Sequence, residues 1–171
     1  MNYLLFSGGL DSTILFHRLV KTDNVFTSVF LDYGQQSLEE ELRVVKNYCD
    51  LYHVPLITYK HKIELDNDFY YKGRNLYLVA VIATFCNKGD TIFIGVNTSD
   101  DRLFPDCRKE FISGLKNALW SGYSINLETP LLDISKRELK AEGSEFFVSY
   151  CYTPVNGSPC GKCISCLEHN K

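Results

Sequence analysis

Short apolar stretches alternate with longer amphipathic ones along most of the chain. Five runs rich in β-branched or aromatic residues predict strands, at residues 2–6, 25–31, 56–59, 91–95 and 125–127. Between and after them, apolar residues recur at helical spacing and predict helices, at residues 11–21, 37–53, 75–87, 105–121 and 135–142. Strands and helices that alternate in this way form a parallel sheet with crossover helices. We therefore expect an α/β fold with an open, mostly parallel five-stranded sheet and helices on both faces.

Two of the predicted helix starts carry a capping box. Ser37 is followed three residues later by Glu40, and Ser135 is followed three residues later by Glu138. In this motif each side chain accepts a hydrogen bond from the backbone N–H of the other residue, which otherwise lacks a partner in the first turn. Pro105 suits the first turn of its predicted helix, because its missing N–H is not needed there.

Length and composition narrow the class of protein. A chain of 171 residues with 45% hydrophobic residues is long enough for one domain that folds without disulfides. We expect that domain at residues 1–149 and a small C-terminal segment at residues 150–171. The net charge of −3 gives no support for a nucleic-acid partner. The longest apolar run, residues 76–86, is too short to span a bilayer, and no signal peptide is evident, so we expect a cytoplasmic protein.

Four of the seven cysteines crowd the C-terminal segment. Cys151, Cys160, Cys163 and Cys166 are spaced by 9, 3 and 3 residues, which is typical of metal ligands. This pattern predicts a closed tetrahedral zinc site, and four free thiols or two disulfides are the alternatives. Because thiolates fill every position of such a site, we expect the metal to be structural and not catalytic.

A polar, glycine-rich segment directly follows the first predicted strand and opens the first predicted helix. Two adjacent glycines let the backbone point successive N–H groups at one spot, where the helix N-terminus adds partial positive charge. Since open α/β sheets bind ligands at the carboxyl ends of their strands, we interpret the segment as a phosphate-binding loop; an ordinary turn with a serine cap is the alternative. Its aspartate suits this place if Mg²⁺ joins it to the phosphates. The residues of the loop are Ser7, Gly8, Gly9, Leu10, Asp11 and Ser12.

Two further polar blocks lie next to predicted elements. Tyr33, Gly34 and Gln35 follow the second strand, where the adenine and ribose of a nucleotide would lie, or they form a plain turn. Arg74 has a planar fork that suits a phosphate or a carboxylate, and Asn75 follows it at a helix start. A surface arginine and a helix cap are the alternatives for these two residues.

Charged residues gather after the fourth predicted strand and at the last predicted helix. A polar heterocycle could bind to Asp100, Asp106 and Arg108, because a carboxylate accepts hydrogen bonds from ring N–H and amino groups. Exposed charges at a junction of loop and helix are the alternative. Lys136 follows the Ser135 cap, and its ammonium could reach the α-phosphate of a nucleotide, unless it is a solvated residue of the first turn.

These motifs together resemble a known family. The loop from Ser7 to Ser12 resembles the pyrophosphate-binding loop of the N-type ATP pyrophosphatases, and the later blocks stand in the order found in the 7-cyano-7-deazaguanine synthase family. The resemblance runs from the first strand to the last cysteine, and it implies a Rossmann-like fold of the adenine nucleotide alpha hydrolase kind. The blocks are Asp32-Tyr33-Gly34-Gln35, Gly73-Arg74-Asn75, Gly95, Asp100, Pro105-Asp106-Cys107-Arg108, Thr129-Pro130-Leu131, Ser135-Lys136 and the four terminal cysteines.

The resemblance implies a function and a set of roles. The expected reaction is the ATP-dependent conversion of 7-carboxy-7-deazaguanine and ammonia to 7-cyano-7-deazaguanine through an acyl-adenylate, in queuosine and 7-deazaguanine biosynthesis. The expected cofactors are ATP, Mg²⁺ and Zn²⁺, and the expected assembly is a homodimer. Catalytic roles fall to Asp11, Arg74 and Lys136. ATP binding falls to the Ser7–Ser12 loop with Tyr33, Gly34 and Gln35, and substrate binding to Asn75, Asp100, Asp106 and Arg108.

The chain also departs from the family pattern on the substrate side. The segment before Gly73 is shorter than in typical members, and Lys72 stands where a proline is usual. Arg102-Leu103-Phe104 replaces the usual Ser-Gly-Tyr. A reaction that stops at the amide, a different deazapurine acid, modification of a tRNA base and a catalytically silent nucleotide-binding module therefore stay open as alternatives.

Overall fold

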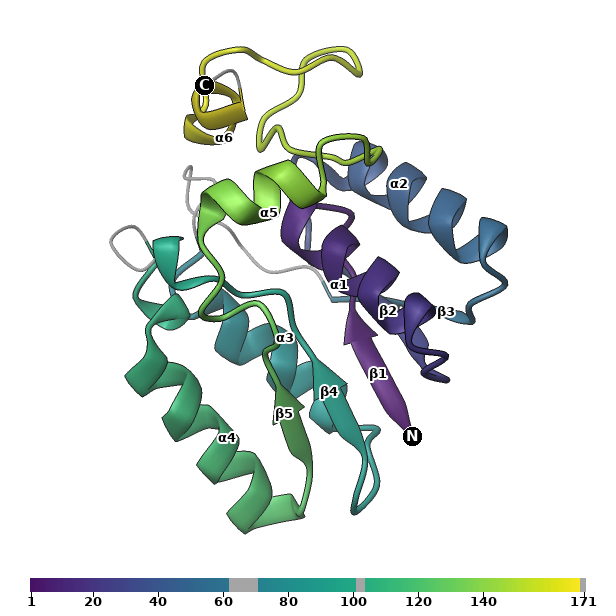
Figure 1. The fold of residues 1–171 in the computed structure, drawn as a ribbon, viewed down its shortest axis with the longest axis vertical. Helices are drawn as coiled ribbons and strands as arrows, with labels where there is room; N and C mark the ends of the chain where they lie inside the picture. Colours follow the sequence, from purple (N-terminus) through teal and green to yellow (C-terminus); the bar gives the residue numbers. More distant parts are fainter. Residues whose placement is uncertain (62–70, 101–103, 170–171) are drawn as a thin grey trace.

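A parallel five-stranded sheet forms the centre of the molecule (Figure 1). The computed structural model describes residues 1–61, 71–100 and 104–169. The strand order is β3-β2-β1-β4-β5, and every neighbouring pair is parallel, so the predicted fold class is confirmed. The strands are β1 (Asn2–Leu5), β2 (Thr27–Asp32), β3 (Leu56–Lys60), β4 (Thr91–Phe93) and β5 (Asn126–Glu128).

Helices cover both faces of this sheet. α1 (Leu10–Lys21), α2 (Leu38–Leu51) and α5 (Lys136–Glu142) pack on one face, and α3 (Arg74–Ala83) and α4 (Lys109–Tyr123) pack on the other. Because successive side chains of a strand point to opposite faces, Leu4 is buried in the first layer and Tyr3 in the second. No helix in the described part of the chain is long and apolar enough to cross a membrane.

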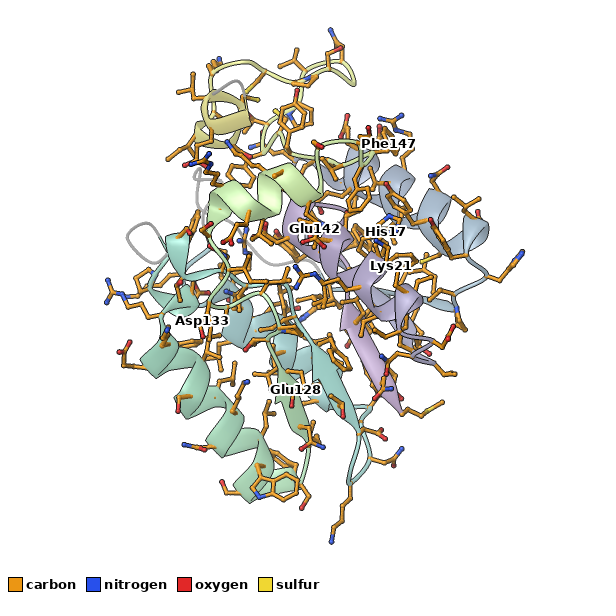
Figure 2. The ribbon with its side chains drawn as sticks, in the orientation of Figure 1. His17, Lys21, Glu128, Asp133, Glu142 and Phe147 are labelled. Atoms are coloured by element: carbon orange, nitrogen blue, oxygen red, sulfur yellow. The ribbon has the colours of Figure 1, made fainter. Side chains whose placement is uncertain are left out.

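An ion pair fixes α5 on α1. Arg18 donates from Nε and Nη2 to the two carboxylate oxygens of Glu142, at 2.9 and 2.6 Å. Figure 2 shows Glu142 beside α1, with His17 nearby. A bidentate pair of this kind restricts orientation as well as distance. The position of α5, which carries Lys136, is therefore set relative to the loop that opens α1.

Only one of the two predicted capping boxes forms. At Ser135 the box is complete: the backbone N–H of Glu138 donates to Ser135 Oγ at 3.3 Å, and the Ser135 N–H donates to Glu138 Oε2 at 3.0 Å. The box predicted for Ser37 and Glu40 is wrong, because Ser37 has ψ near 8° in place of the extended backbone that a cap needs. Its hydroxyl instead donates to Glu41 Oε1 at 2.7 Å.

The helix predicted from residue 105 begins later, at Lys109. Pro105–Cys107 forms a separate 3₁₀ turn, and Arg108 has extended backbone that separates the two. The turn places the Asp106 carboxylate against the first turn of α3, where it accepts from the Asn75 N–H at 2.9 Å.

A last helix was not predicted. α6 (Ile164–His169) lies with the preceding cysteine-rich segment beyond the carboxyl ends of the strands (Figure 1). Its six residues are too few for a periodic pattern to be recognised, and two of the four cysteines, Cys163 and Cys166, lie just before and within it. The short 3₁₀ turn η1 (Thr98–Asp100) follows β4 at the same end of the sheet.

Candidate active site and metal site

A cavity of about 450 Å³ lies at the carboxyl ends of the central strands. The strand order reverses at β1, and this is the edge where open α/β sheets bind ligands. The walls come from the loop after β1, the turn after β2, α2, α3, the end of β4, α5 and the C-terminal segment. The polar residues that line it are Ser7, Asp11, Ser12, Tyr33, Gln35, Glu41, Arg74, Asn75, Asn97, Lys136, Lys140, Ser144, Ser149, Tyr150, Tyr152, Ser165 and Glu168.

The structure brings most of the predicted site residues together in this one cavity. The predicted residues that line it are Ser7, Gly9, Leu10, Asp11, Ser12, Tyr33, Gln35, Arg74, Asn75, Lys136 and Cys151. Gly8, Gly34, Asp106 and Arg108 are not among the lining residues. The side chain of Asp100 lies outside the described part of the structure.

The glycine-rich loop has the backbone that its sequence predicts. Gly8 adopts a φ of +75°, and a Cβ at this position would lie 2.9 Å from the carbonyl oxygen of Glu41. A larger residue would therefore be strained and would push α2 away. Gly9 is the N-cap residue of α1, and the two serine hydroxyls Ser7 Oγ and Ser12 Oγ lie 3.1 Å apart. Hydroxyl donors and the N-terminus of a twelve-residue helix thus face the same end of the cavity.

An ion pair between α1 and α5 stands at this loop. Lys136 Nζ lies 3.3 Å from Asp11 Oδ2, and the two side chains are 30% and 14% exposed. The Lys136 backbone N–H also donates to Ser99 Oγ at 3.3 Å, which joins α5 to the turn after β4. A cation and a carboxylate that approach one helix N-terminus suit a polyphosphate with a bound divalent ion.

Gly95, two residues after β4, lies against the N-terminus of α1 and sets its position. A Cβ at Gly95 would lie 2.9 Å from both the Asp11 carbonyl carbon and the Ser12 nitrogen. The first turn of α1 therefore lies directly on the backbone at Gly95, two residues after β4, and only a glycine permits this approach.

A polar network forms the wall after β2. Gln35 accepts from the Tyr33 N–H at 3.0 Å, and its amide donates to the Leu31 carbonyl at 3.1 Å and to Glu41 Oε2 at 2.9 Å. Burial raises the pKa of the Glu41 carboxyl, and the hydrogen bonds from Gln35 and Ser37 and the charge of Arg74 oppose that rise. No local pattern distinguishes Glu41, which stands as the third member of an acidic run at residues 39–41.

Arg74 faces Glu41 from the start of α3. Burial by itself would lower the pKa of Arg74, but Tyr33, Tyr152 and Asp106 raise it above the ordinary value. The guanidinium carbon lies 5.7 Å from the centre of the Phe104 ring. Arg74 therefore stays a cation, and a carboxylate or phosphate of a ligand can bind to it.

The residues predicted for the substrate side have other contacts here. Asp106 is buried and accepts from the Asn75 N–H, so it caps α3. The Asn75 amide donates to the Asp106 carbonyl at 3.3 Å and to Cys107 Sγ at 3.6 Å. Arg108 is exposed at the start of α4. Asp106 thus places Asn75 and Arg74 at the cavity wall, and a direct contact of Asp106 or Arg108 with substrate stays a prediction.

The four C-terminal cysteines form one cluster. Their sulfurs all lie within 4.8 Å of one another, with Cys151 Sγ and Cys163 Sγ at 4.0 Å and Cys160 Sγ and Cys166 Sγ at 3.9 Å. A tetrahedral ion with metal–sulfur bonds of about 2.3 Å separates its sulfurs by about 3.8 Å. Hydrogen bonds, first that of Thr153, lower the pKa of the Cys160 thiol to about 5, whereas burial raises the pKa of the Cys151 and Cys166 thiols, so it is the distances that indicate a metal site. The donor set therefore fits a single soft metal ion.

The cysteine-rich segment also closes the cavity. The Ser149 N–H donates to the Gly8 carbonyl at 2.8 Å, and Lys140 Nζ donates to the Glu168 carbonyl at 2.5 Å. Cys151 lines the cavity while belonging to the metal cluster. The sequence predicted the metal ligands but not this contact, because nothing local places a C-terminal segment over an N-terminal loop.

Comparison with known proteins identifies the family of the chain. The sequence profile of the family described as "Queuosine biosynthesis protein QueC" matches residues 2–69 and 59–171. Relatives named 7-cyano-7-deazaguanine synthase include those of Leptospira interrogans (31% identical, 98% of this chain and 84% of the relative), Picrophilus torridus (33%, 95% and 82%) and Caldicellulosiruptor bescii (30%, 96% and 88%). The first alignment spans 205 positions, more than the 171 residues of this chain, so it contains gaps in this chain.

Solved structures share the fold at low sequence identity. The U34-tRNA thiolase NcsA of Methanococcus maripaludis, described with its [4Fe-4S] cluster, superposes with a TM-score of 0.61 at 13% identity, over 94% of this chain and 61% of that one. A predicted subunit of a tRNA methyltransferase from Methanocaldococcus jannaschii gives a TM-score of 0.58 at 19% identity, over 86% and 75%. At these identities the likeness supports the fold alone.

Proposed function

The chain belongs to the family of the queuosine biosynthesis protein QueC, and we propose that it is an ATP-dependent ligase that converts 7-carboxy-7-deazaguanine and ammonia to 7-cyano-7-deazaguanine. The observation that carries this proposal is the single cavity in which the phosphate-type loop, the Lys136–Asp11 pair and Arg74 meet. Those features supply the charges that activation of a carboxylic acid by ATP requires.

The chemistry explains why a nucleotide site is needed. A carboxylate resists ammonia because it is negatively charged and lacks a good leaving group. Attack of a carboxylate oxygen on the α-phosphorus of ATP releases pyrophosphate and gives an acyl-adenylate. Ammonia then forms the C–N bond as AMP leaves, which yields the amide and releases a proton. A second ATP activates the amide oxygen, and loss of AMP with the remaining N–H protons gives the nitrile.

The loop from Ser7 to Ser12 and the neighbouring Lys136 would each have a role in forming the acyl-adenylate. Backbone N–H groups at the start of α1 and the hydroxyls of Ser7 and Ser12 would bind the β- and γ-phosphates that leave as pyrophosphate. Asp11 would hold Mg²⁺, which neutralises these phosphates. Lys136 would exchange its contact with Asp11 for the α-phosphate, where negative charge develops in the transition state.

The cavity wall formed by Arg74 and Asn75 suits the carboxylic acid substrate. Arg74 offers a guanidinium that stays charged and can hold the substrate carboxylate toward the α-phosphate. Asn75 lines the same wall, and Asp106 fixes it there through the start of α3. Positioning of the two reactants is the larger part of this catalysis, since neither step needs covalent help from the protein.

Zinc is the metal that we propose for the cysteine cluster. The four sulfurs lie within 4.8 Å of one another, which suits one ion that all four bind. It suits less well a [4Fe-4S] cluster, in which each of four irons binds one cysteine. Zn²⁺ would hold the C-terminal segment in place, and the residues of that segment would cover the nucleotide. We also propose that the protein acts as a cytoplasmic homodimer, as the family resemblance implies.

Mass spectrometry of the products tests the function directly. Purified protein is incubated with 7-carboxy-7-deazaguanine, ATP, Mg²⁺ and ¹⁵N-ammonia, and a protein with Lys136→Ala serves as the control. We expect the labelled nitrile with AMP and pyrophosphate from the first protein only. Accumulation of the labelled amide would assign the reaction that stops early, and absence of any labelled product would refute the proposed substrate.

A further inference from the structure

Glu41 places a half-buried carboxylate in the cavity wall, and the loop chemistry does not use it. It lies in the first turn of α2 and lines the cavity on the side of Tyr33 and Arg74. Among the described residues that line the cavity, the other carboxylates are Asp11, which contacts Lys136 at the loop, and Glu168 in α6. Of these three carboxylates, Glu41 is the one whose pKa the charge of Arg74 lowers against the effect of burial.

The position of this carboxylate is fixed by its neighbours. Ser37 Oγ donates to Oε1 at 2.7 Å, and Gln35 Nε2 donates to Oε2 at 2.9 Å. Gln35 is held in turn by the Tyr33 N–H and the Leu31 carbonyl. Each carboxylate oxygen can accept a second hydrogen bond, since an ionised carboxylate has about four acceptor positions. The network orients Glu41 and leaves acceptor capacity for a ligand.

Glu41 and Arg74 together present acceptors and donors on one wall. A 2-amino-4-oxopyrimidine ring has the opposite pattern along one edge: an amino group and a ring N–H that donate, then a carbonyl that accepts. A carboxylate pairs with the two adjacent donors, and a guanidinium can donate to the carbonyl. Tyr33 and Phe104 both line the cavity and both interact with Arg74, so their rings provide flat apolar surface for a heterocycle there.

We propose that Glu41 determines specificity for the 2-amino-4-oxo edge of the deazapurine, by accepting from its amino group and its ring N–H. The inference rests on the proposed function and names the residue that selects the substrate. A ring without the 2-amino group would lose one charge-assisted hydrogen bond to the Glu41 carboxylate, whose oxygens would keep only the donors Ser37 and Gln35, so it would bind more weakly.

Glu41→Gln isolates the role of the charge. The amide oxygen of the new side chain can accept from Gln35 Nε2, and its NH₂ can donate to Ser37 Oγ, so the wall keeps its hydrogen bonds. The NH₂ group, however, opposes the donors of the ligand edge. Glu39→Gln is the matched control, because Glu39 is exposed on the same helix and loses the same charge.

Calorimetry measures binding without turnover. The probes are 7-cyano-7-deazaguanine, its analogue without the 2-amino group, and ATP. We expect the unmodified protein and Glu39→Gln to prefer the amino compound by about 10- to 150-fold, the range for a hydrogen bond to a charged group. Glu41→Gln should lose this preference and bind ATP as before. Where Glu41→Gln does not fold, Glu41→Asp keeps the charge, withdraws it by one methylene, and should show a reduced preference.

Three results would overturn the inference: the unmodified protein shows no preference for the amino compound, Glu41→Gln keeps the preference, or Glu41→Gln loses affinity for ATP in equal measure. Failure of the proposed function has a different signature. If the preference is present and depends on Glu41 but no acid-dependent AMP forms, the recognition site stands and the reaction does not. If AMP and nitrile form and the preference is absent, only the role of Glu41 is refuted.

Discussion

Gly95→Ala tests whether the backbone just after β4 sets the position of the phosphate loop. The new Cβ would lie 2.9 Å from the Asp11 carbonyl carbon and the Ser12 nitrogen, and ordinary contact begins at 3.4 Å. The first turn of α1 must therefore move by about 0.5 Å, because both atoms belong to the backbone and no flexible side chain can give way. Overpacking of this size costs about 1–3 kcal/mol, or a fall in Tm of about 2–12 °C for a chain of this length.

The same displacement should also slow catalysis. A misplacement of about 1 Å costs about 100-fold in rate, so about 0.5 Å should cost about 10-fold in acid-dependent pyrophosphate release. Gly114→Ala is the control, since Gly114 lies within α4 with no atom within 4 Å of an added Cβ, and it should leave activity unchanged and stability equal or slightly higher. A Gly95→Ala protein with normal Tm and normal pyrophosphate release would show that the loop does not depend on this contact.

Three further outcomes are expected. Asp11→Asn keeps the shape of the loop and removes the charge that would hold Mg²⁺, so acid-dependent pyrophosphate release should fall about 100-fold or more; a normal rate would remove Asp11 from the mechanism. Burial, with the nearby charge of Lys21, lowers the pKa of His17, so the stability that depends on its neutral form is present above about pH 6.5 and is lost as the pH falls toward the lowered pKa. Urea unfolding of His17→Phe should lack this loss, and an identical pH dependence would contradict the assignment. Removal of zinc by a chelator should weaken ATP binding measured by calorimetry, because the Ser149 N–H joins the cysteine-rich segment to Gly8; unchanged affinity would show that the segment does not support the loop.

The sheet was predictable because its signals are local. Runs of β-branched and aromatic residues predicted all five strands to within three residues at each end, and helical periodicity predicted five of the helices. The phosphate-type loop was predictable for the same reason, since adjacent glycines and a helix start lie together in the sequence. The box at Ser135 formed because its serine takes extended backbone. The one expected at Ser37 did not form because its serine has ψ near 8° and its hydroxyl donates to Glu41.

The features that the sequence did not predict depend on contacts between residues far apart in the chain. The start of α4 moved to Lys109 because Asp106 turns toward Asn75, 31 positions away, and no local rule contains that contact. Glu41 was overlooked because only the packing of α2 on the loop decides which member of an acidic run points inward. The position of the cysteine-rich segment over the cavity depends on the cysteine cluster and on the hydrogen bond from the Ser149 N–H to the Gly8 carbonyl. Ser149 and Gly8 are 141 residues apart in the sequence.

The central claim is that the cavity activates the substrate acid by adenylation. The measurement that tests it most directly uses 7-carboxy-7-deazaguanine labelled with ¹⁸O in both carboxylate oxygens, with ATP, Mg²⁺ and ammonia, followed by mass spectrometry of the nucleotide product. Attack of the acid on the α-phosphorus, then displacement by ammonia, must leave one labelled oxygen in each AMP. We predict singly labelled AMP with pyrophosphate. Unlabelled AMP, or ADP with phosphate, would contradict the assignment of the loop and of the reaction built on it.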